Sequence, residues 1–144
     1  AMQWGTDNEP IARMMYEALT GAVVQEVGFI RHPTIEFCGA SPDGLVGDSG
    51  MVEIKCPNTA THIETLLSGM DAGHIPQVQG QMWVCRRQWV DFVSFDPRMP
   101  ERMQLHVQRI ERNDEYINNL QSEVTVFLGE VDALIAKLNE RKAA

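Results

Sequence analysis

Hydrophobic positions recur along this 144-residue chain with two different periods, and each period predicts one kind of element. A period of three to four residues predicts helices over Asn8 to Leu19, Thr59 to Leu67, a segment that begins after Pro76, and Asp114 to Arg141. Apolar runs and alternation predict strands over Val23 to Ile30, Thr34 to Gly39, Met51 to Cys56, Gln88 to Asp96 and Met103 to Ile110. This order of helices and strands predicts a mixed α/β fold, and the length predicts a single domain over residues 1–144.

Turn and cap signals refine this prediction. Three turn segments separate the first three strands, which favours an antiparallel meander: 31–33, 41–44 and 47–50. Thr6 or Asp7 is expected to cap the first helix, and Gly21 is expected to end it. The last helix carries a continuous apolar stripe that is more typical of a packing surface than of a subunit contact: Ile117, Leu120, Val124, Phe127, Val131, Leu134 and Leu138.

The charge balance excludes one class of protein. With 12 Lys and Arg against 20 Asp and Glu, the net charge of −8 argues against a protein that coats nucleic acid, because such proteins are usually basic. An enzyme that acts on nucleic acid stays possible, since acidic residues can be metal ligands. Six arginines fall between positions 86 and 112: Arg86, Arg87, Arg98, Arg102, Arg109 and Arg112. They are either a phosphate-binding surface or ordinary surface residues.

Cysteine and histidine spacing excludes other sites. Cys38, Cys56 and Cys85 form no C-x-x-C pair, so the chain cannot build a zinc ribbon or a four-cysteine iron–sulfur site, and we expect free thiols in a reducing compartment. The four histidines lack metal-ligand spacing, and no glycine-rich phosphate loop supports ATP hydrolysis. No apolar run approaches the ~18 residues of a membrane span, so we expect a soluble, cytoplasmic protein.

The chemistry-bearing segment runs from the Ser41-Pro42-Asp43-Gly44 turn into the strand that contains Glu53, Ile54 and Lys55. Glu53 and Lys55 are two residues apart, so both side chains leave the same face of the strand, while Ile54 points into the core. A hairpin could bring Asp43 beside Glu53. Two carboxylates and the Ile54 carbonyl then form a hard oxygen site suited to Mg²⁺ or Mn²⁺, and Lys55 can orient an attacking water.

The same pattern has a simpler interpretation. A Glu and a Lys on one strand more commonly form a solvated ion pair, and a lone Asp-x₉-Glu-x-Lys pattern arises often by chance. Apolar neighbours of Glu53 indicate, however, that the strand is buried on one face. Burying an unpaired Glu and Lys would cost folding free energy, which favours a role for the two residues in the chemistry of the site.

Four sequence blocks together resemble the YqaJ-like viral recombinase family, to which lambda exonuclease belongs. The blocks are residues 4–13 (WGTDNEPIAR), 41–44 (SPDG), 53–57 (EIKCP) and 77–83 (QVQGQMW). They occur in the order and at the spacing of the family, and the similarity spans about residues 4–96. The resemblance implies a restriction-endonuclease-like core with a PD-(D/E)xK motif, in which helices flank a mixed central sheet.

The resemblance also implies roles for single residues. Asp43 and Glu53 match the metal-binding carboxylates, the Ile54 carbonyl is a further ligand, and Lys55 matches the catalytic lysine. Glu9 matches an acidic residue on the early helix that faces the active site and assists a second metal. Without the resemblance, Glu9 could equally be a partner of the helix dipole.

Two further assignments concern water and DNA. Gln81 matches the glutamine that positions the nucleophilic water; Gln77 shares its helix face, and Gln79 is less favoured. Ser41 is similar to a residue that could hydrogen-bond a terminal phosphate of the DNA.

The function implied is a Mg²⁺-dependent exodeoxyribonuclease (Mn²⁺ being possible) that digests double-stranded DNA from its ends, 5′ to 3′. Its 3′ single-stranded tails would serve phage-type recombination and repair in the bacterial cytoplasm. A homotrimer and a single-strand annealing partner are implied as well. The alternatives are a related endonuclease or junction resolvase, or an inactive DNA-binding domain, which the intact Asp43, Glu53 and Lys55 disfavour. The family's segment ahead of residue 4, with its basic anchor for the 5′-phosphate, has no counterpart in this sequence.

Overall fold

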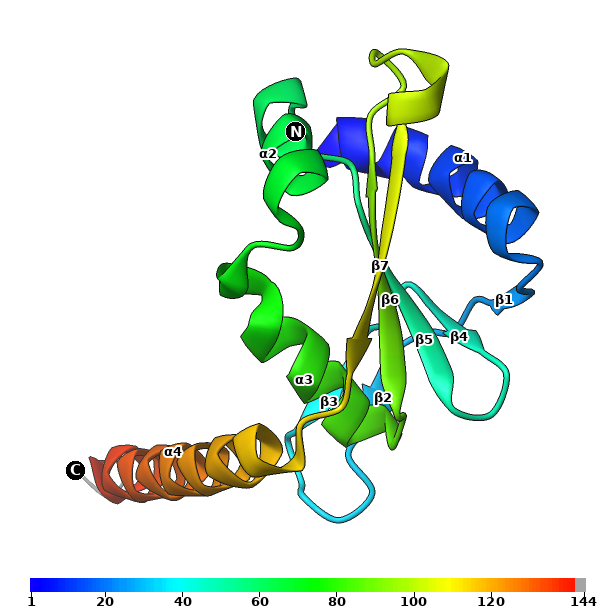
Figure 1. Cartoon of the computed structure of the whole chain (residues 1–144). Coiled ribbons are helices and arrows are strands. Elements are labelled where there is room, and N and C mark those ends of the chain that lie inside the picture. Colours follow the sequence, from blue (N-terminus) through cyan, green and yellow to red (C-terminus); the bar gives the residue numbers. More distant parts are fainter. Residues whose placement is uncertain (142–144) are drawn as a thin grey trace. The chain divides into compact units, whose positions relative to one another are not determined.

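The computed structural model describes residues 1–141 and divides into a body, residues 1–112, and a second unit that begins at Asn113. The centre of the body is a five-stranded sheet in the order β1-β4-β5-β6-β7 (Figure 1). Its strands are β1 Val24–Gln25, β4 Gly44–Val46, β5 Gly50–Lys55, β6 Trp89–Phe95 and β7 Leu105–Glu111. Only β5 and β6 pair in parallel within this sheet, and β2 Ile30–Arg31 and β3 Gly39–Ala40 form a separate antiparallel pair. The predicted mixed α/β class is confirmed.

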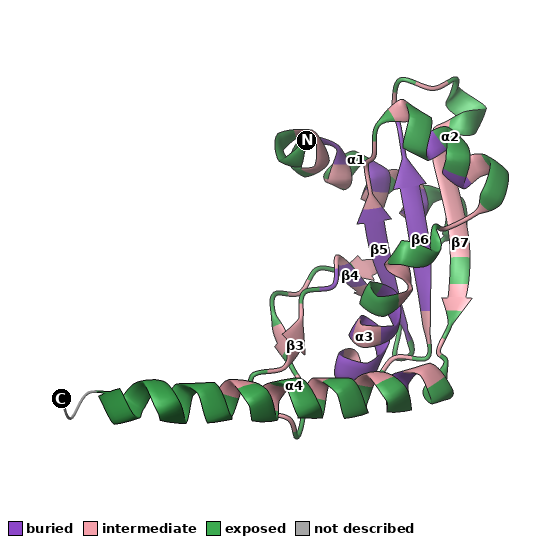
Figure 2. Ribbon diagram, turned by 90° about the vertical axis from the view of Figure 1, so that its left-hand side faces the viewer, coloured by how far each residue is buried: buried purple, intermediate pink, exposed green. Residues whose placement is uncertain are grey.

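Helices lie on both faces of the sheet, and one face is covered by the crossover connection that a parallel pair of strands needs. The crossover from β5 to β6 contains α2 Thr59–Ser68, the short 3₁₀ helix η1 Ala72–His74, and α3 Ile75–Cys85. The opposite face of the sheet packs against α1 Met2–Thr20, and a second 3₁₀ helix, η2 Glu101–Met103, lies between β6 and β7. As a result β5 and β6 hold most of the buried residues of the sheet (Figure 2).

Alternation along β5 decides which side chains face each helix. Ile54 packs in the core cluster that contains Ala12 and Tyr16 of α1, and so faces that helix. Met51 packs with Val78 and Met82 of α3 and so faces the other side. Because strand side chains alternate, Glu53 lies on the face of Met51, under α3. The prediction that Ile54 points into the core is therefore confirmed.

The first helix begins earlier than predicted. It starts at Met2, and Pro10 lies within it, so the expected caps at Thr6 or Asp7 are wrong. Its buried positions are Asn8, Ala12 and Tyr16, and the polar Asn8 hid the start of the helical period from the hydrophobic pattern. The predicted end is confirmed: Gly21 has φ 72°, and its N–H donates to the carbonyl of Glu17.

The early strands also differ from their prediction. Residues 34–38 form a loop in which the N–H groups of Thr34 and Ile35 donate to His32 Nδ1, and Phe37 adopts a left-handed φ of 61°. The strand expected over Val23 to Ile30 is reduced to β1, with Ile30 opening β2. The antiparallel neighbour of β5 is instead β4, which starts inside the predicted turn. The remaining helices and strands match their predicted ranges to within two residues.

The second unit contains α4 Asp114–Glu140, close to its predicted range. Asn113 caps its start, with its side-chain oxygen accepting from the N–H of Tyr116. Phe127, Leu134 and Leu138, three members of the apolar stripe, expose 59%, 58% and 55% of their surface. The function of the stripe and the assignment of all 144 residues to one domain stay predictions. No helix within residues 1–141 is both long enough and apolar enough to cross a bilayer.

Candidate active site

Glu53 is a buried carboxylate with three donors. Only 3% of the residue is exposed. Gln77 Nε2 donates to its Oε1 over 2.9 Å, and Gln81 Nε2 donates to its Oε2 over 3.0 Å. Lys55 Nζ lies 2.8 Å from Oε1. Both oxygens of Glu53 are thus held by side chains from α3 and from its own strand.

The two glutamines lie one helical turn apart on the same face of α3, as the spacing predicts. Gln79 points elsewhere, and its Nε2 donates to the Glu111 carbonyl. Gln77 is exposed, whereas Gln81 is buried and its Oε1 has no hydrogen-bond partner within residues 1–141. The assignment of the water-positioning role to Gln81 stays a prediction, and Gln77 is the more accessible of the two amides.

The interpretation of Glu53 and Lys55 as a solvated ion pair is wrong. The Glu53 side chain is 4% exposed and that of Lys55 is 31% exposed, so the pair lies partly inside the protein. The burial follows from β5 being an interior strand of the sheet, covered by α3 on this face.

Asp43 reaches the same end of β5 from the turn before β4. The antiparallel register places Gly44 opposite Val52, and Asp43 Oδ2 accepts from the Ile54 N–H over 2.7 Å. Burial and the negative charges of Glu53 and Glu9 together raise the pKa of Asp43 to about 7, although the hydrogen bond from Ile54 acts in the opposite direction. The predicted neighbourhood of Asp43 and Glu53 is confirmed.

Glu9 lies on α1, the helix that packs on β5, and its negative charge acts on Asp43. It lies well inside the helix rather than at its start, so it is not a partner of the N-terminal dipole. Arg13 Nη2 donates to its Oε1 over 2.9 Å, and the same nitrogen lies 3.2 Å from Oε1 of Glu26. The sequence predictions did not include Arg13, although its position one turn after Glu9 is a recognisable i,i+4 pair.

Cys56 lies directly after β5, and nearby acidic residues affect the pKa of its thiol. Burial, together with the negative charges of Glu9, Asp43 and Asp96, raises the pKa of its thiol to about 11. The thiol therefore stays protonated at neutral pH. All three cysteines are free, as predicted.

Ser41 is exposed in the loop that leads to Asp43. Its hydroxyl is accessible to solvent, and its contact with a DNA phosphate stays a prediction.

The donors at this site suit a hard divalent cation. No group of three or more His, Cys, Asp or Glu side chains is arranged to hold a metal ion in residues 1–141. The predicted ligands are instead two carboxylates and a backbone carbonyl, from Asp43, Glu53 and Ile54, an arrangement that leaves room for water and phosphate oxygens around Mg²⁺. The like charges that raise the pKa of Asp43 would be offset by such a cation. Glu9 as a further ligand stays a prediction.

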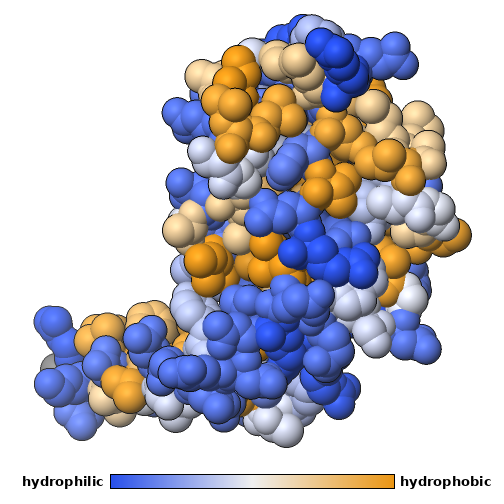
Figure 3. All heavy atoms as spheres, in the orientation of Figure 1, coloured by the Kyte–Doolittle hydropathy of each residue, from blue (hydrophilic) through white to orange (hydrophobic). Residues whose placement is uncertain are grey.

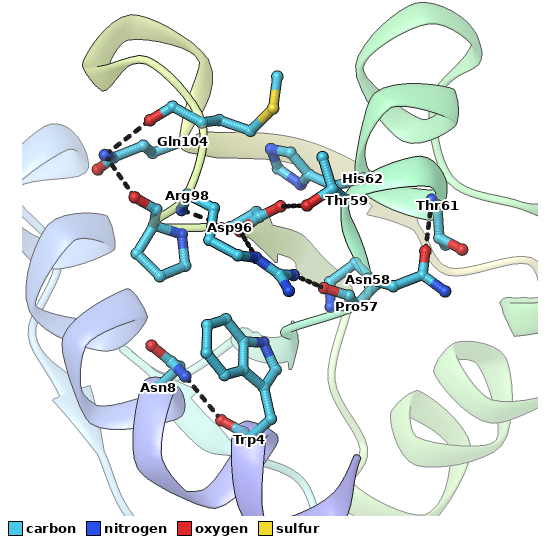
Figure 4. A network of polar contacts seen from close by, with 12 residues as sticks. Trp4, Asn8, Pro57, Asn58, Thr59, Thr61, His62, Asp96, Arg98 and Gln104 are labelled. Carbon is cyan, nitrogen blue, oxygen red and sulfur yellow. Dashed lines mark hydrogen bonds and ion pairs between the residues drawn. The ribbon is translucent and has the colours of Figure 1, made fainter.

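A second buried carboxylate lies at the end of β6, next to β5. Asp96 is fully buried and accepts from Thr59 Oγ1 over 2.6 Å, from Arg98 Nε over 2.7 Å and from the Arg98 N–H over 3.0 Å (Figure 4). Burial alone would raise the pKa of Asp96, but these hydrogen bonds and the Arg98 charge together lower it.

Arg98 connects Asp96 to two other elements. Its Nη2 donates to the Pro57 carbonyl over 3.2 Å, and its guanidinium lies 4.3 Å from the ring centroid of Trp4 in α1 (Figure 4). We call Trp4, Pro57, Thr59, Asp96 and Arg98 the anchor network. It joins α1, which carries Glu9, to the chain that follows Lys55, and sequence reasoning missed it.

The arginines between positions 86 and 112 are mostly engaged within the body. Arg87 donates to the Gly47 and Gly50 carbonyls, Arg112 donates to the Met82 carbonyl, and Arg109 holds Asp91 while stacking 3.6 Å from the Trp89 ring centroid. The face of the body in Figure 3 likewise mixes hydrophilic and hydrophobic residues. Arg87, Arg109 and Arg112 are thus held by contacts inside the body, and the phosphate-binding surface stays one of two interpretations.

Trp83 and His62 are packed inside the body. Trp83 is 7% exposed, and its ring lies 4.6 Å from that of His32. His62 is fully buried between Ser94 Oγ at 2.7 Å and the Met103 carbonyl at 2.8 Å. Because the carbonyl can only accept, His62 donates through Nε2 and accepts the Ser94 hydroxyl at Nδ1.

Residues 1–88 match the YqaJ-like viral recombinase domain. The fold is similar to an alkaline exonuclease from Laribacter hongkongensis, with a TM-score of 0.96 and 53% sequence identity over 99% of this chain and 74% of that chain. A structure of that exonuclease in complex with dAMP matches equally well.

Two other proteins are similar at greater distance. A phage-related exonuclease from Haemophilus somnus 129PT shares the fold with a TM-score of 0.76, at 20% identity over 95% of this chain and 73% of that chain. The uncharacterised protein ExoD of Escherichia coli (strain K12) is 36% identical over 75 residues, which cover 50% of this chain and 85% of ExoD.

Proposed function

The chain belongs to the YqaJ-like viral recombinase family, and from this premise we propose that it is a phage-type exonuclease that hydrolyses double-stranded DNA from its ends. The observation that carries the proposal is that Asp43, Glu53 and Lys55 come together at the end of one buried strand. The chain that forms this site is 53% identical in sequence to an alkaline exonuclease with the same fold. Charged groups held together in this way, with a raised pKa at Asp43, are typical of catalytic sites.

We propose Mg²⁺ as the cofactor, with Asp43, Glu53 and the Ile54 carbonyl as its ligands and Glu9 as a further ligand. Mn²⁺ fits the same donors. When bound, a divalent cation polarises the phosphodiester and lowers the pKa of a water ligand. Lys55, held by Glu53 and partly exposed, orients the attacking water and stabilises the negative charge that develops on phosphorus. Gln77 and Gln81 fix both Glu53 oxygens, so that the carboxylate does not rotate during the reaction.

The finer features of the activity rest on the family resemblance. We propose digestion 5′ to 3′, which leaves 3′ single-stranded tails, and use of these tails by a single-strand annealing protein in DNA recombination. A homotrimer around the DNA and a contact of Ser41 with a terminal phosphate belong to the same proposal. Because its substrate would be phage or bacterial DNA, the protein would act in the bacterial cytoplasm.

The test is a digestion of linear 5′-phosphorylated duplex beside a covalently closed circle, with Mg²⁺ and with a chelator. We expect loss of the linear duplex only, and only with Mg²⁺. Cleavage of the circle would instead indicate an endonuclease or junction resolvase, and digestion in chelator would refute the role of the metal.

A variant pair tests the site itself. Lys55→Met keeps the aliphatic stem but removes the ammonium group, and should slow digestion of linear duplex by about 100-fold or more, the range seen when one charge-stabilising donor is lost. Lys137→Met in α4 is the matched control and should digest DNA at the wild-type rate. Equal rates for Lys55→Met and wild type would contradict the assigned site, and light scattering would test the trimer.

A further inference from the structure

We propose that Arg13 is a built-in counter-cation of the acidic site, which competes with the divalent metal for Glu9 and thereby sets how much Mg²⁺ the protein needs. The inference rests on the proposed metal-dependent function and concerns a residue to which that function assigns no role. If so, replacing Arg13 by a neutral residue should increase the affinity of the protein for Mg²⁺, whereas the loss of a structural residue would lower it.

The contacts of Arg13 show a cation that two acids share. Its Nη2 lies 2.9 Å from Oε1 of Glu9 and 3.2 Å from Oε1 of Glu26. The Arg13 side chain is only 15% exposed, against 33% for Glu9 and 71% for Glu26. One partly buried positive charge therefore faces two negative charges, and the trio carries a net charge of −1.

Arg13 contacts Glu9 through one nitrogen only, so the ion pair is not bidentate. Both ion pairs use the same nitrogen, and Arg13 Nε is buried without a hydrogen-bond partner in the described residues. A bidentate pair between guanidinium and carboxylate is stronger and geometrically fixed. The observed arrangement leaves Glu9 free to exchange Arg13 for another cation with little loss of hydrogen bonding.

Glu9 lies close enough to the site for this exchange to matter. Ala12, one turn along α1, packs in the same core cluster as Val52 and Ile54 of β5. The negative charge of Glu9 raises the pKa of both Asp43 and Cys56. The carboxylate of Glu9 thus belongs to the electrostatic environment of the Asp43 and Glu53 pair.

Coulomb's law then gives the direction of the effect. Every negative charge near Asp43 and Glu53 favours a divalent cation there, and every positive charge opposes it. Arg13 neutralises part of Glu9, which relieves repulsion in the metal-free protein but weakens the attraction for Mg²⁺. A residue that only supported the fold would have the opposite signature, because its loss would loosen the site and weaken metal binding.

The experiment is a calorimetric titration of Mg²⁺ into the metal-free protein without DNA. Two neutral variants, Arg13→Met and Arg13→Gln, should each bind Mg²⁺ about 3- to 10-fold more tightly than wild type, the size expected for losing one positive charge near a partly solvated site. Arg13→Lys keeps the charge and should stay within about twofold. Arg102→Met removes an exposed arginine and controls for the change in net charge.

The outcomes separate the inference from the proposed function. Mg²⁺ binding by the wild type together with unchanged or weaker binding by the folded neutral variants would overturn the role of Arg13 alone. If wild type bound no Mg²⁺ at millimolar concentration, the metal-dependent mechanism would fail and this inference with it. Should Arg13→Met not fold, Arg13→Gln decides, because its amide can still hydrogen-bond both glutamates.

Discussion

Two buried carboxylate clusters lie side by side at the ends of β5 and β6, and they differ in how their charge is compensated. In the anchor network, Asp96 has three donors and its pKa is lowered. At the other cluster, burial and the negative charges of Glu53 and Glu9 raise the pKa of Asp43 to about 7. Burial alone therefore does not identify a functional acid. Negative charge in excess of its protein partners distinguishes the candidate site from the structural network beside it.

The strongest test of this comparison exchanges one acid in each cluster for its amide. Asp43→Asn should lower kcat on linear duplex by about 1,000-fold or more, because a proposed metal ligand is lost. Its stability without metal should be equal or higher at pH 8, since the amide can still accept from the Ile54 N–H and no longer repels Glu53. Digestion rates and urea unfolding measure the two quantities. A variant that is inactive because it is unfolded would contradict this account.

The second test concerns the anchor network. Asp96→Asn should lower the free energy of unfolding by about 2 kcal/mol, since it replaces a buried carboxylate that accepts three hydrogen bonds and pairs with a half-exposed arginine. Urea unfolding at pH 7 gives the value. Below the unfolding transition the variant should keep Mg²⁺ binding within about threefold, as it leaves the donors at β5 in place. A stable variant with no Mg²⁺ binding would reverse the roles of the two clusters.

The third test uses pH. A raised folded pKa means that the contribution of Asp43 to stability is fully present below its ordinary value of 3.8 and is lost as pH rises through about 7. Asp96 behaves oppositely: its contribution is present above 3.8 and is lost as pH falls through its lowered folded pKa. As the pH rises from 5 to 8, the melting temperature of the metal-free wild type should therefore fall relative to that of Asp43→Asn. Parallel melting curves for the two proteins would argue against charge excess at the site.

The smallest expected effect belongs to Arg98. Arg98→Lys keeps the positive charge but removes the contact with the Asp96 side chain through Nε and the stacking on Trp4. The loss in unfolding free energy should be about 1 kcal/mol, because an exposed lysine replaces a fixed planar group. Arg102→Lys, in the exposed η2, is the matched control and should change stability by less than about 0.5 kcal/mol. A loss of several kcal/mol would mean that Arg98 supports more of the fold than these contacts explain.

The candidate site could be predicted from sequence where its residues share one element. Glu53 and Lys55 are two apart on a strand, and Gln77 and Gln81 are one turn apart on a helix, so local periodicity places each pair on one face. Asp43 follows from the short hairpin that joins it to Glu53. The anchor network could not be predicted, because Trp4, Pro57 and Arg98 meet only through the tertiary fold.

The errors in the fold have a similar cause. β4 has three residues, too few for a period, and it is a strand only because β5 and β1 pair with it. Residues 34–39 have strand-like composition, but two of their N–H groups bind His32 Nδ1 instead of a neighbouring strand. Hydrophobic pattern thus predicts elements that bury a face and is weakest where a side chain satisfies the backbone.

The parallel pairing of β5 with β6 has a kinetic consequence. The β4–β5 hairpin is local in sequence, so Asp43 and Glu53 can meet early in folding, whereas Lys55 and its register partner Ser94 are separated by the whole crossover. Closing such a long loop is slow compared with forming a hairpin. The amide donors of α3 arrive only with that closure. In a newly synthesised chain, Asp43 and Glu53 would therefore come together before Gln77 and Gln81 can bind Glu53. The complete site would form only in the last steps of folding.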